Sequence, residues 1–209
     1  DGVIVLAPLE PGNYGLSVMS EDGVFETAFD VVESAKSVIR YGFLSDFSPE
    51  DDDLADVDWL CRLHVNTVQF YDWMYRHDRL ISPEEEYLDP IGRSSSLRTI
   101  RQKIDACRSR GMRAFAYGAV YAATKETVSA QPDWAAYTMD GDPMVFADWL
   151  NYMNISPNSG WSQYIVQEFR SAVESQGFSG INLDTYGFPK RIYAYNGARV
   201  SFEDVFLPL

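Results

Sequence analysis

The sequence predicts an α/β fold in which a short β-rich segment, residues 1–38, precedes four strand–helix units in residues 39–209. Apolar and polar residues alternate in the first segment, which is the period of a half-buried strand, whereas apolar residues at helical spacing separate the later strands. Alternating units of this size build a parallel sheet, and four of them amount to the first half of a (β/α)8 TIM barrel. A doubly wound sheet is the competing architecture, but no glycine-rich phosphate loop follows any strand.

The first segment is expected to be the end of a β-sandwich domain. Residues 3–6 form a short apolar run, and apolar residues alternate in 14–18 and 25–31, on either side of a turn at Glu21-Asp22-Gly23. Alternation on both sides of such a turn is typical of a β-hairpin. A hairpin of this size is too small to hold a core by itself, so we expect further strands to complete the domain.

The second segment is expected to contain strands at 39–46, 66–73, 113–121 and 180–186. The first helix is expected to begin at Ser48, with Pro49 at its first helical position. The next two are expected to end at Gly111 and Gly177, since glycine is common directly after a helix. A further helix opens at Ser201 and the chain stops within its pattern, which predicts a truncated barrel.

Composition narrows the classes of function. The formal net charge of −14 disfavours nucleic-acid binding, because an acidic surface repels phosphate backbones. No apolar run reaches the ~18 residues of a membrane-spanning helix, so no membrane role is expected. Cys61 and Cys107 are expected to be buried free thiols, and two histidines, His64 and His77, give no basis for a metal site. Aromatic residues make up 14% of the chain, and a subset is expected to stack on sugar rings in a cleft.

Asp184 is the clearest candidate for a catalytic residue. It ends a strand that is expected to be buried on both faces, at the carboxyl end where barrel enzymes place their reactive groups. An unpaired carboxylate in such a place is unfavourable unless it has a function. The alternative is an aspartate that caps the loop before Gly187.

Two further aspartates follow predicted strands. Asp72 lies among aromatic residues, where it could accept a hydrogen bond from a sugar hydroxyl or pair with Arg76 or Arg79. Asp46 could contact substrate or cap the entry to the next helix. The acidic run at 51–53 suits a helix N-terminus, where the helix dipole favours negative charge, and needs no catalytic role.

Four blocks of sequence resemble those of a known family. They are RYGFLSDF at 40–47, VQFYDWMYRH at 68–77, AYGAVYAA at 116–123 and LDTYG at 183–187. In this order they resemble glycoside hydrolase family 66, which contains endo-dextranases and cycloisomaltooligosaccharide glucanotransferases. The upstream β segment resembles the immunoglobulin-like domain that precedes the barrel of that family.

The resemblance implies a retaining mechanism on α-1,6-glucan, namely dextran and isomaltooligosaccharides. The sequence indicates no cofactor and no metal. The family's nucleophile corresponds to Asp184, and its acid/base is a glutamate on a later strand, beyond Leu209. The side chains expected to contact substrate are Asp46, Gln69, Asp72, Trp73, Tyr75, His77, Tyr117, Tyr121 and Tyr186.

Endo-hydrolysis of dextran is the expected function, because hydrolysis needs less additional machinery than cyclisation. Intramolecular transglycosylation by a cycloisomaltooligosaccharide glucanotransferase is the alternative within the family, and a non-catalytic glucan-binding protein is the alternative of another class. Polymeric dextran does not enter cells, so a secreted protein is expected.

Overall fold

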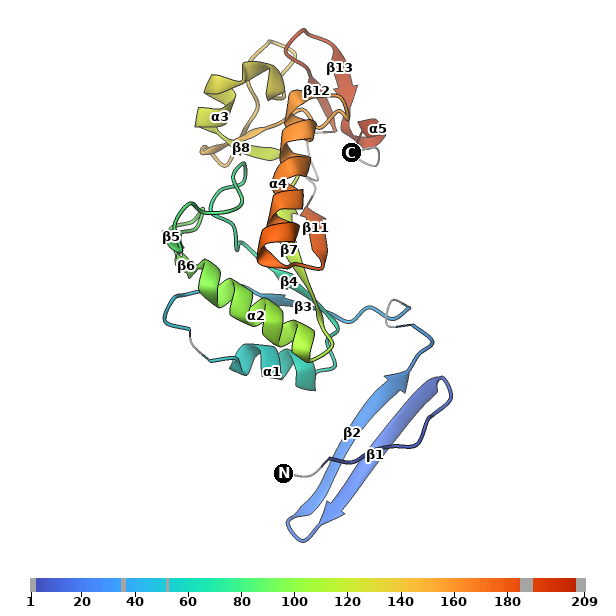
Figure 1. Cartoon of the computed structure of the whole chain (residues 1–209). Helices are drawn as coiled ribbons and strands as arrows, with labels where there is room; N and C mark the ends of the chain where they lie inside the picture. The colour runs from blue at the N-terminus through green and yellow to red at the C-terminus, as the bar shows by residue number, and fades with distance from the viewer. Residues whose placement is uncertain (1–2, 35–36, 52, 185–189, 206–209) are drawn as a thin grey trace.

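The computed structural model describes residues 3–34, 37–51, 53–184 and 190–205 of the chain. Figure 1 shows a hairpin at one end, a sheet covered by helices in the middle and a group of short elements at the other end. The helices are α1 (Ala55–Arg62), α2 (Leu97–Ser109), α3 (Lys125–Ala130), α4 (Gly160–Gln176) and α5 (Phe202–Val205). None of the helices in these ranges is long and apolar enough to cross a membrane.

A four-stranded parallel sheet forms the centre of the chain. Its strands are β3 (Tyr41–Leu44), β4 (Thr67–Phe70), β7 (Arg113–Ala119) and β11 (Gly180–Asp184), in the order β11-β7-β4-β3. Helices α1, α2 and α4 pack against it, and α2 and α4 lie in front of the sheet in Figure 1. The predicted mixed α/β fold with parallel strands is therefore confirmed. β3, β4 and β7 are shorter than predicted, and β3 and β4, with 4 residues each, have half the predicted length.

The two faces of the sheet differ in what covers them. Gly42 and Leu44 of β3 are buried, whereas Tyr41 and Phe43, which alternate with them, are 40% and 57% exposed. Residues in register on parallel strands point to the same face. We call the face of Tyr41 and Phe43 the open face; by register it also carries Gln69, Phe115, Tyr117, Asn182 and Asp184. The nucleophile candidate therefore lies on the face that the helices do not cover.

The core lies between the sheet and the helices. Phe47 and Phe70 stack with ring centroids 5.3 Å apart, and Phe178 meets Phe70 edge-on at the same distance. Trp161 of α4 is fully buried, and its Nε1 donates to the carbonyl of Val120 over 2.7 Å. These contacts tie α4 to the carboxyl end of β7.

The ends of α2 and α4 follow from local chemistry. Ser96 precedes α2, and its hydroxyl accepts hydrogen bonds from the backbone N–H groups of Arg98 and Thr99, which are otherwise unpaired at a helix start. Gly177 ends α4 in the left-handed conformation, with φ of 85°. Glycine adopts this conformation without steric cost, so the predicted end of this helix is confirmed.

The start predicted for the first helix is wrong, because α1 begins at Ala55. The carboxylate of Asp46 accepts from the backbone N–H of Ser48 at 3.0 Å, and the Ser48 hydroxyl accepts from that of Glu50 at 3.2 Å. These local bonds form a turn that competes with helix formation. The cap predicted at Ser48 therefore belongs to a turn.

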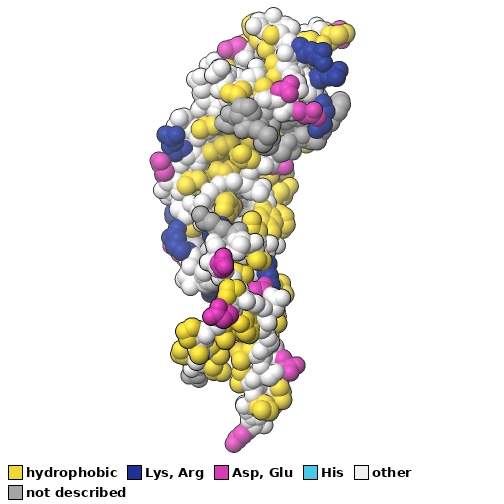
Figure 2. All heavy atoms as spheres, turned by 90° about the vertical axis from the view of Figure 1, so that its right-hand side faces the viewer, with side chains coloured by type: hydrophobic (Ala, Val, Ile, Leu, Met, Phe, Trp, Pro, Cys, Tyr) yellow, Lys and Arg dark blue, Asp and Glu magenta, His cyan; other side chains and the backbone are white. Residues whose placement is uncertain are grey.

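The N-terminal hairpin is formed by β1 (Gly12–Ser20) and β2 (Gly23–Val31), as the alternation predicted. Its pairing places Val18 opposite Phe25 and Tyr14 opposite Phe29. The apolar run at 3–6 lies outside any strand. Figure 2 shows apolar side chains gathered at several places along one side of the molecule, and Phe25 is 62% exposed.

Shorter strands complete the structure. β5 (Glu86–Leu88) pairs with β6 (Ser94–Ser96), and β12 (Arg191–Tyr193) pairs with β13 (Arg199–Ser201). An insertion after β7 forms a small sheet of β8 (Ala122–Thr124), β10 (Leu150–Tyr152) and β9 (Val145–Phe146), together with the 3-10 turn Pro132–Trp134. Cys61 and Cys107 are both free, and Cys107 is buried.

Candidate active site

A cavity opens at the carboxyl edge of the sheet. Because the four strands are parallel, their carboxyl ends meet at this edge. The cavity measures about 330 Å³ and is lined by Tyr71, Asp72, His77, Pro90, Ile91, Tyr117, Tyr121, Phe146, Trp149, Leu150 and Asp184. Two carboxylates, one imidazole and several aromatic rings thus share one hollow.

Asp184 is the last residue of β11, and its carboxylate is held by a neighbouring strand. The hydroxyl of Tyr117, on β7, donates to Asp184 Oδ2 over 2.7 Å. Burial, followed by this hydrogen bond, raises the pKa of Tyr117 well above its ordinary value of 10.0. Tyr117 therefore stays protonated and remains a hydrogen-bond donor to the carboxylate throughout the physiological pH range.

Asp72 reaches the cavity through an unusual backbone conformation. Its φ is 51°, in the left-handed region that aspartate tolerates better than most side chains. Its carboxylate lies 3.9 Å from the guanidinium of Arg93, so neither Arg76 nor Arg79 is the partner that the sequence suggested. Burial raises the pKa of Asp72, Arg93 lowers it, and the carboxylates of Asp89 and Asp184 raise it further.

His77 is a neutral imidazole at the cavity wall. It is 9% exposed, and its ring lies 5.4 Å from that of Trp149. Burial lowers the pKa of His77 to about 4, with a smaller opposing effect from Asp78. Within the described ranges, Nδ1 of His77 is buried without a hydrogen-bond partner. A buried polar atom of this kind is suited to a hydroxyl of a bound molecule.

Tyr121 also lines the cavity, and burial, with a smaller effect from Asp184, raises its pKa to about 12. Tyr186 lies outside the described residues. The structure therefore brings together five of the residues that the sequence selected. They are Asp72, His77, Tyr117, Tyr121 and Asp184.

Three other selected residues lie away from the cavity wall. Trp73 is fully buried, and its Nε1 donates to the carbonyl of Tyr117 over 3.1 Å, so it supports β7 and cannot stack on a substrate. Gln69 lies on the open face, where it accepts a hydrogen bond from the hydroxyl of Tyr41. Tyr75 is covered by the guanidinium of Arg76, 4.0 Å from its ring centroid.

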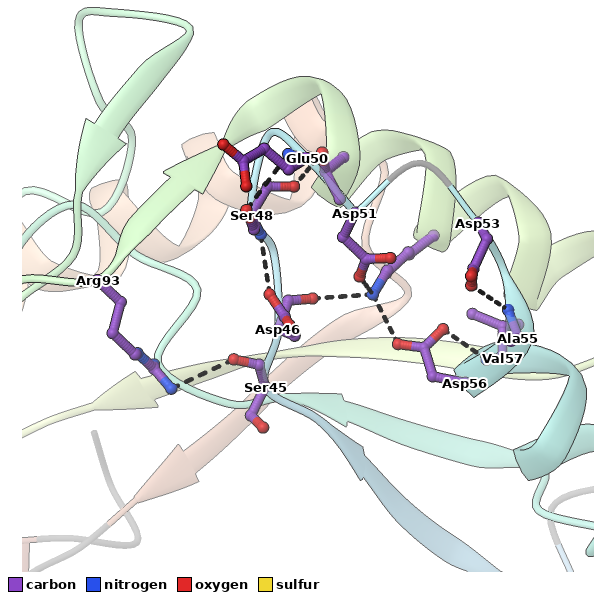
Figure 3. Close-up of polar contacts among 12 residues, drawn as sticks. Ser45, Asp46, Ser48, Glu50, Asp51, Asp53, Ala55, Asp56, Val57 and Arg93 are labelled. Atoms are coloured by element: carbon purple, nitrogen blue, oxygen red, sulfur yellow. Dashed lines mark hydrogen bonds and ion pairs between the residues drawn. The ribbon is translucent and has the colours of Figure 1, made fainter.

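Asp46 has a structural role in the turn after β3. Figure 3 shows its carboxylate bonded to the backbone of Ser48, and its carbonyl accepts from Nζ of the buried Lys103 at 2.9 Å. The same amine pairs with Asp51 and with Asp56, the latter at 2.6 Å. Asp46 thus caps a turn and not the predicted entry to a helix, since α1 begins at Ala55, and Asp51 pairs with a lysine.

The insertion after β7 supplies one wall of the cavity, which was not predicted from the sequence. Phe146 and Trp149 flank a turn in which Ala147 and Asp148 have φ of 52° and 62°. Alanine gives no sequence indication of such a conformation, so only the aromatic content of the segment pointed to a binding role. The insertion is tied to the sheet at Val120, whose N–H donates to the carbonyl of Asp184 over 3.2 Å.

Comparison with known families identifies the class of protein. The sequence model of glycosyl hydrolase family 66 matches residues 14–209, and the chain belongs to this family. Within the described ranges, no group of three or more His, Cys, Asp or Glu side chains could hold a metal ion.

Particular relatives are cycloisomaltooligosaccharide glucanotransferases. Two from Niallia circulans are 32% identical over 199 residues and 30% identical over 203 residues, and each alignment covers 87% of this chain. The chain spans only 20% and 21% of these relatives.

Solved structures extend the comparison. A Paenibacillus sp. cycloisomaltooligosaccharide glucanotransferase complexed with cycloisomaltoheptaose has a TM-score of 0.84 at 28% identity, covering 96% of this chain and 31% of that one. The maltogenic α-amylase AmyB from Thermotoga neapolitana has a TM-score of 0.54 at 18% identity, covering 74% and 40%, and shows a likeness of fold alone.

Proposed function

We propose that the protein containing this chain cleaves α-1,6-glucosidic bonds in dextran-type glucans with retention of configuration, and that Asp184 is the nucleophile. The observation that carries this proposal is the carboxylate of Asp184, oriented by Tyr117 in a cavity with aromatic walls. Flat rings bearing polar edges suit the apolar faces and hydroxyls of pyranose rings. Membership of family 66 and the named glucanotransferase relatives support this substrate class.

The proposed mechanism has two displacements. Asp184 attacks the anomeric carbon while a carboxylic acid protonates the leaving glycosidic oxygen, which gives a covalent glycosyl-enzyme. Water or a sugar hydroxyl then attacks the same carbon and breaks its bond to Asp184, which leaves as a carboxylate, and the conjugate base takes the proton of the attacking group. The family resemblance assigns the acid/base to a glutamate beyond Leu209. Asp72 and the unpartnered nitrogen of His77 are then available to bind sugar hydroxyls.

We propose that the parallel sheet is the first half of a (β/α)8 barrel, because Tyr41 and Phe43 are exposed on the open face, where a closed barrel has a filled interior. We also propose that the β1–β2 hairpin belongs to an immunoglobulin-like sandwich, which is supported by Phe25, an exposed apolar residue on a face of alternating apolar residues. The domain division at residues 38 and 39 remains a prediction.

Hydrolysis and transglycosylation share the first displacement and differ in the acceptor of the second. Endo-hydrolysis of dextran is our sequence-based expectation, whereas the names of the curated relatives favour cyclising transglycosylation as the second candidate. A non-catalytic glucan-binding protein is the alternative of another class. We further propose an extracellular location, because the polymer does not enter cells.

Product analysis on dextran with the full-length protein tests these proposals. Linear isomaltooligosaccharides would indicate hydrolysis, and products lighter than these by one water would indicate cyclisation. Asp184→Asn should lower turnover by several orders of magnitude while dextran binding persists. The matched control is Asp46→Asn, which changes an aspartate that is bonded to Ser48 at another strand end. Unchanged turnover in Asp184→Asn would refute the assignment of the nucleophile, and no product from a folded wild type would favour the binding protein.

A further inference from the structure

We propose that Arg93 is a positioning residue for catalysis, which holds Asp72 in the cavity as an ion-paired carboxylate by joining it to the buried Asp89. This inference rests on the proposed function and goes beyond it, because Arg93 does not line the cavity. Arg93 lies in the turn between β5 and β6 and contacts two other segments. These are Ser45, directly after β3, and Asp72, two residues after β4.

Asp89 holds the Nε end of the Arg93 guanidinium. Its side chain is fully buried, and Oδ1 accepts the backbone N–H groups of Ile91 and Arg93 at 3.0 and 2.8 Å. Its other oxygen, Oδ2, accepts from Nε of Arg93 at 2.6 Å. A charge-assisted bond to a buried carboxylate leaves the guanidinium little freedom to move.

The far end of the guanidinium faces the strand ends. Nη1 of Arg93 donates to the carbonyl of Ser45 over 3.3 Å, as Figure 3 shows, and Nη2 lies 3.9 Å from Oδ2 of Asp72. Arginine can make these contacts together because its donors form a planar fork, whereas a lysine amine is a single point charge. Arg93 thus joins the turn after β3 to the aspartate after β4.

Asp72 needs such a partner because its other surroundings disfavour its charge. Its side chain is 20% exposed, and burial together with Asp89 and Asp184 favours the protonated carboxyl. Tyr71, whose pKa is raised chiefly by Asp72, and His77 are both neutral neighbours in the cavity. Arg93 is the cation that opposes these effects, so its removal should raise the pKa of Asp72.

The test compares Arg93→Gln with wild type in the full-length protein, using the pH profile of kcat/KM on isomaltooligosaccharides. We expect the acid limb of the profile to move to higher pH by about one unit, which corresponds to roughly a tenfold loss at a fixed pH on that limb. Arg93→Lys restores the charge without the fork, so it should return the acid limb toward wild type while leaving kcat reduced. Arg101→Gln is the matched control, because Arg101 is 41% exposed, against 40% for Arg93, and pairs with Glu85.

The alternative is that Arg93 only supports the loop that carries Ile91. An equal loss of kcat/KM at every pH would show that role and overturn the proposal. Carbon-detected NMR titration of Asp72 gives a readout that does not require turnover, and an unchanged midpoint in Arg93→Gln would also overturn it. A wild type that cleaves no glucan would refute the proposed function, and the titration would still decide whether Arg93 holds Asp72 charged. If Arg93→Gln does not fold, Arg93→Lys decides. Its lost fork should lower kcat while the acid limb stays close to wild type, and a wild-type kcat would overturn the proposal.

Discussion

Replacing Tyr117 with phenylalanine in the full-length protein would remove the hydroxyl that donates to Asp184 over 2.7 Å. The ring would remain in place, packed against the ring of Tyr71 with centroids 5.0 Å apart. Burial and the bond to Asp184 both raise the pKa of Tyr117, so the hydroxyl is a donor at every pH at which the enzyme would work. The variant therefore isolates one hydrogen bond to the proposed nucleophile.

The size of the effect follows from the charge of the acceptor. A hydrogen bond to a charged group contributes roughly 1.5–3 kcal/mol. Each 1.36 kcal/mol in the barrier is about a tenfold change in rate, so the bond accounts for roughly 10- to 100-fold in kcat/KM if it serves to orient Asp184 for attack. The expected loss lies mainly in kcat, because the hydroxyl orients the nucleophile rather than the bound sugar.

Initial rates on isomaltooligosaccharides measure this loss, and thermal unfolding checks that the variant is folded. Tyr71→Phe is the matched control, since Tyr71 lines the same cavity and its pKa responds chiefly to Asp72. A Tyr117→Phe variant with wild-type kcat/KM, or a control with an equal loss, would refute the orienting role of the hydroxyl.

Three further predictions concern stability. Burial lowers the pKa of His77 from 6.5 to about 4, so the unfolded chain binds this proton more tightly than the folded one. The unfolding free energy should therefore be highest above pH 6.5 and should fall by up to roughly 3 kcal/mol as the pH drops toward 4. Urea unfolding across this range should show that the unfolding free energy of His77→Gln depends less on pH than that of wild type. An equal pH dependence in the two proteins would contradict the lowered pKa of His77. Lys103→Met should lower the unfolding free energy by about 2–3 kcal/mol. This loss is smaller than for a fully buried ion pair because Asp51 and Asp56 are partly exposed. Changing both aspartates to Asn in the same chain should recover most of the lost stability. Residues 1–209 expressed alone should associate through the outer edges of β3 and β11, which pair with no further strand among the described residues. A monomer that unfolds cooperatively in size-exclusion and denaturation experiments would contradict this.

The sequence was informative where the determining interactions are local. Apolar periodicity predicted the four strands and the bodies of α1, α2 and α4, and the rule that barrel enzymes place reactive groups at strand ends selected Asp184. The start of α1 was mispredicted because Asp46 and Ser48 form side-chain bonds to the backbone, which compete with a helix and leave no distinct pattern. Local patterning therefore predicted the sheet but not its turns.

The cavity wall was predicted less well, for a different reason. Trp73 follows Asp72 directly and was expected to share its environment, but the left-handed conformation of Asp72 breaks the alternation and sends Trp73 into the core. Phe146 and Trp149 reach the cavity from an insertion whose path depends on two residues with positive φ. Neither conformation can be derived from residue type alone, so which aromatic residue faces the cavity depends on tertiary structure.

The attachment of the insertion at Val120 has an evolutionary consequence. The backbone of Val120 bonds to the carbonyl of Asp184 on one side and to the Trp161 indole on the other, and neither bond involves the Val120 side chain. Substitutions of the partly exposed Phe146 and Trp149 can therefore reshape this wall of the cavity while the strand carrying Asp184 is preserved. Under the proposed function, selection on this wall would act on product size separately from bond cleavage, and a library that randomises Phe146 and Trp149 samples that variation directly.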